Sequence, residues 1–199
     1  MKNARNLSGF KGKKSQRGNY LLSIGMGIMV MAILAVWGVP KIKDYLIEGA
    51  IPSVAEETQR FIAKVKINSA GSGTEPFTGL DQEYFARAVR GGSLQVGDVS
   101  GQGTGGEVVR HGLGGGSAGT IEISETGDAF ALTFENVNQA ACPSLATALQ
   151  RTVDDISING TAVKTTDDDM NVELAYIAST AASACSDGDV NEFIFTIKN

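Results

Sequence analysis

The chain opens with a positively charged segment, which is followed by a long run of uncharged residues. The first 18 residues contain no acidic residue, and their basic residues are Lys2, Arg5, Lys11, Lys13, Lys14 and Arg17. Residues 19–39 carry no charge, and as an α-helix this run would be roughly 31 Å long, enough to cross the hydrocarbon core of a bilayer. Basic residues before such a span favour a cytoplasmic N-terminus. The sequence therefore predicts one membrane-spanning helix.

This N-terminal segment differs from an ordinary secretory signal peptide. A signal peptide has an apolar core of about 7–15 residues, and its cleavage site follows that core. Here the apolar run is longer, and the candidate processing point, Arg17-Gly18, precedes it. Residues 1–18 are therefore a basic leader that comes before the apolar helix, and the segment is not an ordinary signal peptide.

A second helical pattern continues beyond the apolar run. Apolar residues recur at helical spacing between charged residues, at Ile42, Leu46, Ala50, Val54, Phe61 and Val65. We expect one helix over residues 19–66, with a membrane-spanning half at 19–39 and an amphipathic half that presents one face to a globular domain. Pro40 and Pro52 each predict a bend or local melting, because proline removes a backbone donor.

Residues 67–199 predict one globular domain of helices and antiparallel strands. Apolar alternation predicts a hairpin over 121–134, a second hairpin over 156–163 and a final strand that contains Phe193, Phe195 and Ile197. Asn159-Gly160 at the centre of the second hairpin is typical of a type I′ turn. Short helices are expected over residues 81–90, with Asp81 or a neighbour as its cap, and over 139–153 and 172–184. Residues 97–119 are expected to form a loop with one short strand around 108–109. The predicted fold class is α+β, with the long helix packed against one side of an antiparallel sheet.

Charge and cysteine content restrict the function classes. Removal of the leader changes the formal net charge from −5 to −11, because six positive charges leave with it, and an acidic chain does not favour phosphate contacts with nucleic acid. Cys142 and Cys185 both follow the membrane segment and would therefore face an oxidising compartment. We expect them to form a disulfide, worth about 4 kcal/mol in the chain-entropy model.

Three motifs that could indicate chemistry are better explained as structural features. Residues 101–106 match the glycine pattern of dinucleotide-binding proteins, but further glycines follow instead of a helix. His111, the only histidine, is expected to lie exposed in a loop without an ordered Ser–His–Asp set. Residues 167–169 lack the ligand spacing of a calcium loop and predict a solvated acidic turn that caps a helix. We predict no catalytic residue, no metal site and no cofactor, and a protein that is not an enzyme.

The order of these N-terminal features resembles that of the type IV pilins. In that family a basic leader ends in glycine and is followed directly by a retained apolar helix, as Gly18 and residues 19–39 are here, and Pro40 lies 22 residues beyond the glycine. The 18-residue leader favours the type IVb branch.

The C-terminal third strengthens this resemblance. Residues 138–145 (NQAACPSL) and 184–188 (ACSDG), followed by a terminal strand, are similar to the disulfide-bounded C-terminal region of type IVb pilins. The resemblance is greatest to the PilS-like and toxin-coregulated subunits. It covers residues 1–66 and about 130–199.

The resemblance implies processing and polymerisation. A prepilin peptidase would cleave after Gly18, and the new amine on Asn19 would be methylated. The apolar helix would hold the subunit in the inner membrane and then pack with copies of itself in an extracellular pilus that serves adhesion, aggregation or conjugative contact. Further partners implied are an assembly ATPase with an inner-membrane platform and an outer-membrane secretin. The positions implied in polymerisation are Leu21, Leu22, Ser23, Ile24, Met26, Ile28, Val30 and Pro40.

Two positions depart from the family pattern. Most of these pilins carry a glutamate at the fifth residue after the cleavage point, where this chain has Ser23. The first mature residue is usually a methylated Phe, Met or Leu, where this chain has Asn19. A minor or tip pilin or a pseudopilin therefore stays an alternative to a major subunit. A single-pass anchored binding domain that does not polymerise is the alternative from a different class.

Overall fold

The computed structural model describes residues 17–70, 73–98, 106–167 and 169–199. The chain divides into two compact units, Met1–Lys41 and Ile42–Asn199. Helix α1 (Arg17–Ser69) contributes to both units, so the second half of the helix belongs to the globular unit. The helix predicted over 19–66 is therefore present and slightly longer than expected.

Helix α1 is continuous through both prolines. No residue between Arg17 and Ser69 leaves the helical conformation, so of the two outcomes predicted at Pro40 and Pro52, a bend or local melting, the melting does not occur. Within the globular unit, one face of α1 is buried, at Ile47, Ile51, Val54, Ala55, Phe61, Ile62 and Val65. Packing of this apolar face holds the helix together around Pro52, because the proline removes only one backbone hydrogen bond.

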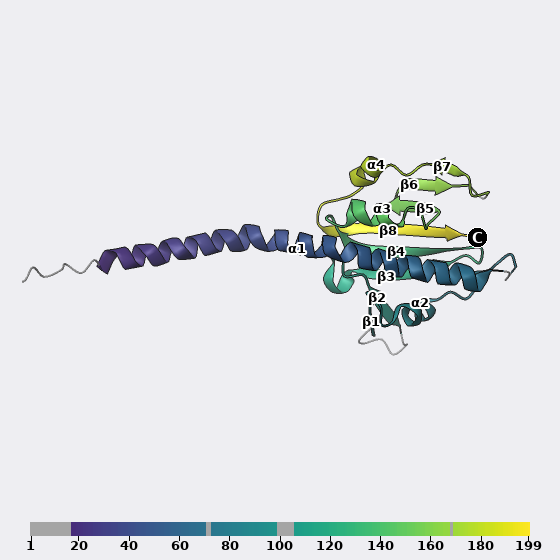
Figure 1. Cartoon of the computed structure of the whole chain (residues 1–199), viewed down its shortest axis with the longest axis horizontal. Helices are drawn as coiled ribbons and strands as arrows, with labels where there is room; N and C mark the ends of the chain where they lie inside the picture. The colour runs from purple at the N-terminus through teal and green to yellow at the C-terminus, as the bar shows by residue number, and fades with distance from the viewer. Residues whose placement is uncertain (1–16, 71–72, 99–105, 168) are drawn as a thin grey trace, which may run out of the picture. The chain divides into compact units, whose positions relative to one another are not determined.

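Eight strands form one antiparallel sheet in the order β1-β2-β3-β4-β8-β5-β6-β7. The last strand of the chain, β8, is inserted between β4 and β5 near the middle of the sheet (Figure 1). The strand bounds are β1 Gln95–Asp98, β2 Glu107–Arg110, β3 Thr120–Glu125, β4 Ala129–Asn138, β5 Asp155–Ile158, β6 Thr161–Thr166, β7 Val172–Leu174 and β8 Asp189–Lys198.

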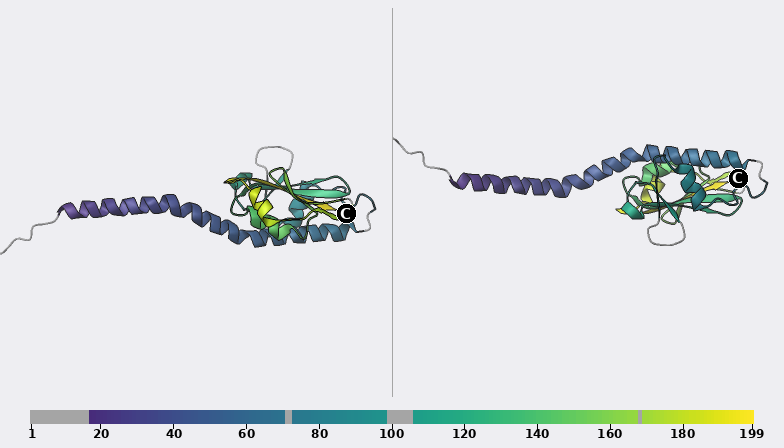
Figure 2. Two further views of the ribbon diagram at one scale, coloured as in Figure 1. Left: turned by 90° about the horizontal axis from the view of Figure 1, so that it is seen from above. Right: turned by 90° about the horizontal axis from the view of Figure 1, so that it is seen from below.

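The second half of α1 lies along one face of this sheet (Figure 2). Aromatic side chains fill the space between them: the ring of Phe61 on α1 lies 4.8 Å from that of Phe85 and 6.3 Å from that of Phe130 on β4. Along β8, Phe193, Phe195 and Ile197 are fully buried and alternate with partly exposed residues. The predicted α+β arrangement, with a helix packed on an antiparallel sheet, is confirmed.

Three α-helices and one 3-10 turn complete the described part of the globular unit: α2 Gln82–Val89, η1 Gly116–Ala118, α3 Cys142–Leu149 and α4 Ala178–Ser183. Helix α2 was predicted, and so was its cap. The Asp81 carboxylate accepts a hydrogen bond from the Tyr84 amide at 2.7 Å and thus caps the first turn. Helix α3 was also predicted, but it is shorter than the expected 139–153.

The helix predicted over 172–184 was wrong in its first half. Residues Val172–Leu174 form β7, which pairs with β6 at the edge of the sheet, and the helix is limited to Ala178–Ser183. The prediction of a loop over 97–119 also missed strand β1, which pairs with β2 and places Val96 opposite Val109. Both errors arise from pairing with the neighbouring strand, which supplies backbone hydrogen bonds that the propensity of the segment itself does not reveal.

The tight hairpin between β5 and β6 has the predicted turn. Asn159 has φ of 50° and Gly160 has φ of 77°, the pair of positive values that a type I′ turn requires. The register pairs Ile158 with Thr161 on either side of these two residues.

Candidate functional site

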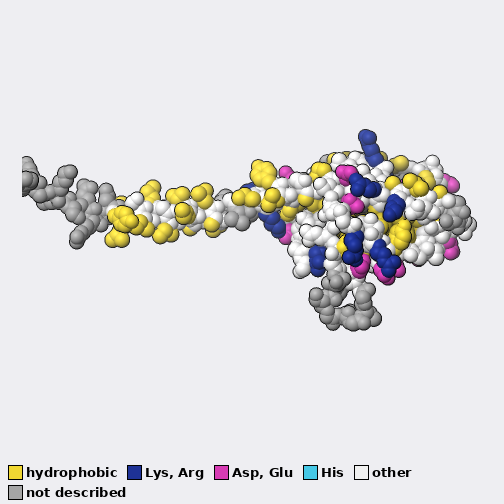
Figure 3. Space-filling view, turned by 60° about the horizontal axis from the view of Figure 1, so that its bottom comes forward, with side chains coloured by type: hydrophobic (Ala, Val, Ile, Leu, Met, Phe, Trp, Pro, Cys, Tyr) yellow, Lys and Arg dark blue, Asp and Glu magenta, His cyan; other side chains and the backbone are white. Residues whose placement is uncertain are grey.

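The N-terminal unit presents an unpartnered apolar surface. Large apolar side chains from Tyr20 to Val36 are exposed by 43–74%, at Tyr20, Leu21, Leu22, Ile24, Met26, Ile28, Met29, Val30, Met31, Ile33, Leu34 and Val36. These yellow side chains cover the N-terminal part of α1 in Figure 3. Burial of each such side chain is worth roughly 1.5–3 kcal/mol. A helix of this kind therefore requires lipid or other protein chains around it.

Helix α1 is the one helix in the described ranges that is long and apolar enough to cross a membrane, judged by length and composition. Its first turn contains Gly18 and Asn19, whereas leader residues 1–16 lie outside the described residues. Ser23 is exposed on the same helix. No atom outside the helix backbone lies within 4 Å of the Cβ positions of Gly25 and Gly27, so a second helix could approach closely there.

The predicted disulfide joins Cys142 to Cys185, whose Cα atoms lie 6.1 Å apart. Cys142 is the first residue of α3 and is fully buried, and Cys185 follows α4. The bond therefore attaches the α3 region to the segment that leads into the central strand β8.

A buried asparagine holds the segment after the disulfide in place. Asn191, which is fully buried on β8, accepts a hydrogen bond from the Ser186 amide at 2.6 Å and donates to Val137 O at 3.1 Å. Asn159 donates to Asn191 Oδ1 at 2.9 Å and to Ala184 O at 2.8 Å. The turn residue Asn159 thus has a second role that the local hairpin pattern did not indicate.

His111 is buried, so the prediction of an exposed loop histidine was wrong. Its side chain is only 2% exposed, and its ring stacks on that of Phe134 with centroids 5.8 Å apart. Nδ1 accepts a hydrogen bond from the Leu113 amide at 2.9 Å, so Nε2 carries the proton and donates to Glu135 O at 2.8 Å. Burial lowers the pKa of His111, although the bond to Glu135 opposes this shift.

His111 anchors a glycine-rich loop at residues 112–116. Gly114 and Gly115 have φ of 125° and 66°, and a Cβ on either would lie less than 3 Å from atoms of Asn138 or Asn136. The loop is further held by Asn138, whose amide donates to Leu113 O at 2.8 Å. Glycine is therefore needed at both positions, for backbone conformation and for close packing.

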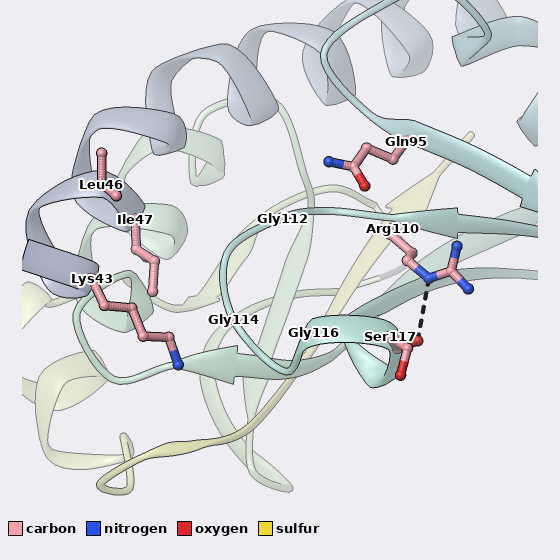
Figure 4. Close-up of a pocket in the computed structure, with 9 residues that line it drawn as sticks. All are labelled: Lys43, Leu46, Ile47, Gln95, Arg110, Gly112, Gly114, Gly116 and Ser117. Atoms are coloured by element: carbon pink, nitrogen blue, oxygen red, sulfur yellow. Dashed lines mark hydrogen bonds between the residues drawn. The ribbon is translucent and has the colours of Figure 1, made fainter. Parts of the chain in front are cut away.

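A cavity of about 560 Å³ opens beside this loop (Figure 4). It is lined by Lys43, Leu46, Ile47, Gln95, Arg110, Gly112, Gly114, Gly116 and Ser117. Lys43 comes from α1 and Arg110 from the end of β2, and Figure 4 shows them on either side of the glycine-rich loop. None of the described lining residues is acidic.

The two basic side chains are held differently. Lys43 Nζ pairs with Asp189 Oδ2 at 2.6 Å, and Asn138 Nδ2 donates to the other oxygen of Asp189 at 2.5 Å. Although desolvation raises the pKa of Asp189, these hydrogen bonds and the Lys43 charge lower it overall. Arg110 donates Nε–H to Ser117 O at 3.3 Å, and within the described ranges its guanidinium has no ion pair.

The structure gives no support to the other motifs as chemical sites. Within the described part of the chain, no three His, Cys, Asp or Glu side chains gather as metal ligands. Residues 101–105 of the glycine pattern and Asp168 lie outside the described residues. Asp167 does not cap a helix as predicted; its carboxylate accepts hydrogen bonds from the Asn171 amide and side chain, which lower its pKa.

The family comparison matches the C-terminal part of the chain. The family model described as PilS N terminal matches residues 105–198. This match supports a type IVb pilin. The predicted resemblance to PilS-like pilins is confirmed over these residues, which make up slightly less than half of the chain. The comparison with curated proteins gives no match.

Solved structures of type IV pilins are similar to the chain. The crystal structure of a type IVb pilin from Salmonella typhi is 20% identical over 76% of this chain and 97% of that chain, with a TM-score of 0.45. The crystal structure of TcpA, a type IV pilin from the Vibrio cholerae El Tor biotype, is 15% identical over 74% and 98%, with a TM-score of 0.47. The NMR structure of the Salmonella typhi type IVb pilin PilS is 18% identical over 71% and 95%, with a TM-score of 0.34.

Proposed function

We propose that this chain is a prepilin of a type IVb-like pilus. The prepilin is held in the inner membrane by residues 19–39, with its N-terminus in the cytoplasm, and is cleaved after Gly18. The mature subunits then polymerise through the apolar helix into an extracellular filament used for adhesion, aggregation or conjugative contact. A prepilin peptidase, an assembly ATPase with its membrane platform and an outer-membrane secretin act on the subunit.

The observation that carries the proposal is the exposed apolar half of α1. Its large side chains are exposed by 43–74% in the single chain. Lipid covers such a surface before assembly, and the helices of other subunits cover it afterwards. Both environments are apolar, so transfer between them costs little hydrophobic free energy, and close packing at Gly25 and Gly27 favours the assembled state.

Cleavage is tested on filaments sheared from cells that produce the full chain. We expect mass spectrometry to find a peptide that begins at Asn19 with a methylated amine, and no peptide from residues 1–18. Gly18→Ala should abolish that peptide and reduce filament yield by at least tenfold, because a Cβ obstructs the approach of the peptidase to the backbone. Gly12→Ala, within the leader, is the matched control and should leave both unchanged.

The rival function is an anchored binding domain that does not polymerise. It predicts an intact chain of 199 residues in the inner-membrane fraction and no fibres. Filaments that form in normal amounts from Gly18→Ala would also contradict the proposed processing.

Ser23 favours a second candidate, a minor or tip pilin. A serine cannot form the ion pair with a neighbouring N-terminal amine that the glutamate of most pilins is thought to make. Immunogold labelling distinguishes the two: even labelling along the shaft indicates a major subunit, and sparse or terminal labelling indicates a minor one.

A further inference from the structure

We infer that the cavity beside the glycine-rich loop binds the phosphate-bearing headgroup of an anionic phospholipid. The inference rests on the proposed function to the extent that residues 19–39 lie in a bilayer. The cavity has two basic side chains, Lys43 and Arg110, and a wall made of glycine backbone. Its volume of about 560 Å³ is large enough for a headgroup rather than a single ion.

The charge of this cavity is opposite to that of the unit that contains it. Residues 42–199 contain all 22 acidic residues of the chain and only 10 of its 17 basic residues. Among the described residues that line the cavity, two are nevertheless basic and none is acidic. Asp189 pairs with Lys43 at 2.6 Å, whereas the guanidinium of Arg110 has no ion pair within the described residues. An anionic ligand would therefore be attracted here and repelled by most of the remaining surface.

Donors in the cavity are free to take up a phosphate. Lys43 uses one of its three N–H groups for Asp189, and its side chain is 52% exposed. Arg110 uses Nε for Ser117 O and retains its two terminal NH₂ groups, which suit phosphate oxygens. His111 and Asp189 hold the loop between these two residues in place, so the cavity wall is preformed.

The position of Lys43 in the sequence favours a lipid over a soluble anion. Lys43 follows the apolar run by four residues, which is about 6 Å along a helix, and a headgroup layer is roughly 5–8 Å thick. Ile42, Tyr45 and Leu46 are exposed by 60–74% on the same turn of α1. Apolar and aromatic side chains of this kind suit the interface between headgroups and acyl chains.

Native mass spectrometry of the full chain tests the inference. The protein is purified in detergent with dioleoyl phosphatidylglycerol or, in parallel, with dioleoyl phosphatidylcholine, and the retained lipid is counted. We expect the wild-type chain to retain phosphatidylglycerol preferentially. Arg110→Gln and Lys43→Gln should each weaken that retention by roughly tenfold, the effect of one lost charge-assisted hydrogen bond, and Lys43→Arg should restore it.

Two matched variants control for charge alone. Arg151→Gln removes an exposed arginine without an ion pair in the described ranges, and Lys64→Gln removes an exposed lysine from α1. Both should retain phosphatidylglycerol as the wild type does. Equal losses in Arg110→Gln and Arg151→Gln, or equal retention of the two lipids, would overturn the inference. Displacement of the lipid by millimolar inorganic phosphate would also overturn it, because the ligand would then be a soluble anion.

A contact between subunits is the competing use of this surface. If Arg110→Gln lowers filament yield but leaves lipid retention unchanged, the cavity faces another copy of the chain and the lipid assignment is wrong. Lipid retention is measured on the uncleaved chain, so it does not depend on processing. Failure of the Gly18→Ala test would therefore refute the proposed function and leave this measurement interpretable.

Discussion

At the scale of a single residue, the imidazole of His111 fixes the conformation of the glycine-rich loop. Its unprotonated Nδ1 accepts the Leu113 amide, and its protonated Nε2 donates to Glu135 O. Protonation of Nδ1 would place two donors against each other in a buried site. Burial also disfavours the charged ring, so the neutral imidazole is the form that fits the fold.

The first prediction concerns pH. Burial lowers the pKa of His111, whereas in the unfolded chain it stays near 6.5. The unfolded state therefore binds more protons as the pH falls below about 6.5, and the free energy of unfolding decreases by up to about 1.4 kcal/mol per pH unit. Above pH 6.5 the contribution is fully present. Pulse proteolysis of the full chain in detergent, with urea, measures this decrease between pH 7 and pH 5.

His111→Phe provides the control for this prediction. It keeps an aromatic ring on Phe134 but leaves the buried Leu113 amide unpaired, which should cost about 1–3 kcal/mol at pH 7. His111 is the only histidine, so the variant should lose the pH dependence between pH 7 and 5. The lowered pKa of Asp189 affects stability only at lower pH, as the carboxylate becomes protonated. An unchanged slope in the variant would contradict the assignment to His111.

At the scale of an element, the β5–β6 hairpin depends on two residues with positive φ. Gly160 has φ of 77°, and no atom lies within 4 Å of its Cβ position, so a substitution there meets no steric obstacle. Gly49 in α1 also has open space around its Cβ position but has ordinary helical φ. These two glycines separate the effect of backbone conformation from the effect of packing.

The second prediction compares alanine at these two sites. Gly160→Ala should lower the free energy of unfolding by about 1–2 kcal/mol, because an L-residue is strained at positive φ. Gly49→Ala should raise it by about 0.4–1 kcal/mol, because alanine reduces the entropy of the unfolded chain and favours helix. The urea midpoints of the two variants should therefore move in opposite directions; a shift in the same direction would contradict the turn assignment.

At the scale of the whole molecule, the disulfide connects parts of the chain that local contacts do not hold together. Cys142 and Cys185 are 43 residues apart, and the segment between them contains α3, the β5–β6 hairpin, the edge strand β7 and α4. Strand β7 and much of α4 are exposed, so this region buries less apolar surface than the centre of the sheet. The crosslink compensates by limiting the unfolded states available to this segment.

The third prediction removes this crosslink. The double variant Cys142→Ser, Cys185→Ser should lose about 4 kcal/mol of unfolding free energy in the chain-entropy model. The urea midpoint of the wild-type chain should fall to the value of the variant after reduction, and the variant should not respond to reductant. If reduction leaves the wild-type midpoint unchanged, the bond does not stabilise the fold.

The sequence alone determined the features that depend on local pattern. The backbone hydrogen bonds of the apolar run form within α1 itself, and Asp81 caps the helix that directly follows it. Asn159 and Gly160 supply the two positive φ values of the turn in which they lie. The two cysteines allowed only one pairing. In each case the interacting groups lie close in sequence or have no competing partner.

Only the tertiary structure decided the features that depend on partners outside the segment itself. Residues 172–174 became a strand because β6 supplied backbone partners, and β1 formed against β2 in the same way. His111 was buried by Phe134 and Glu135, which lie more than 20 residues away. The basic cavity likewise required α1, β2 and the glycine-rich loop to meet. The spacing of residues along the sequence does not indicate which segments come into contact, because those contacts depend on the packing free energy of the complete fold.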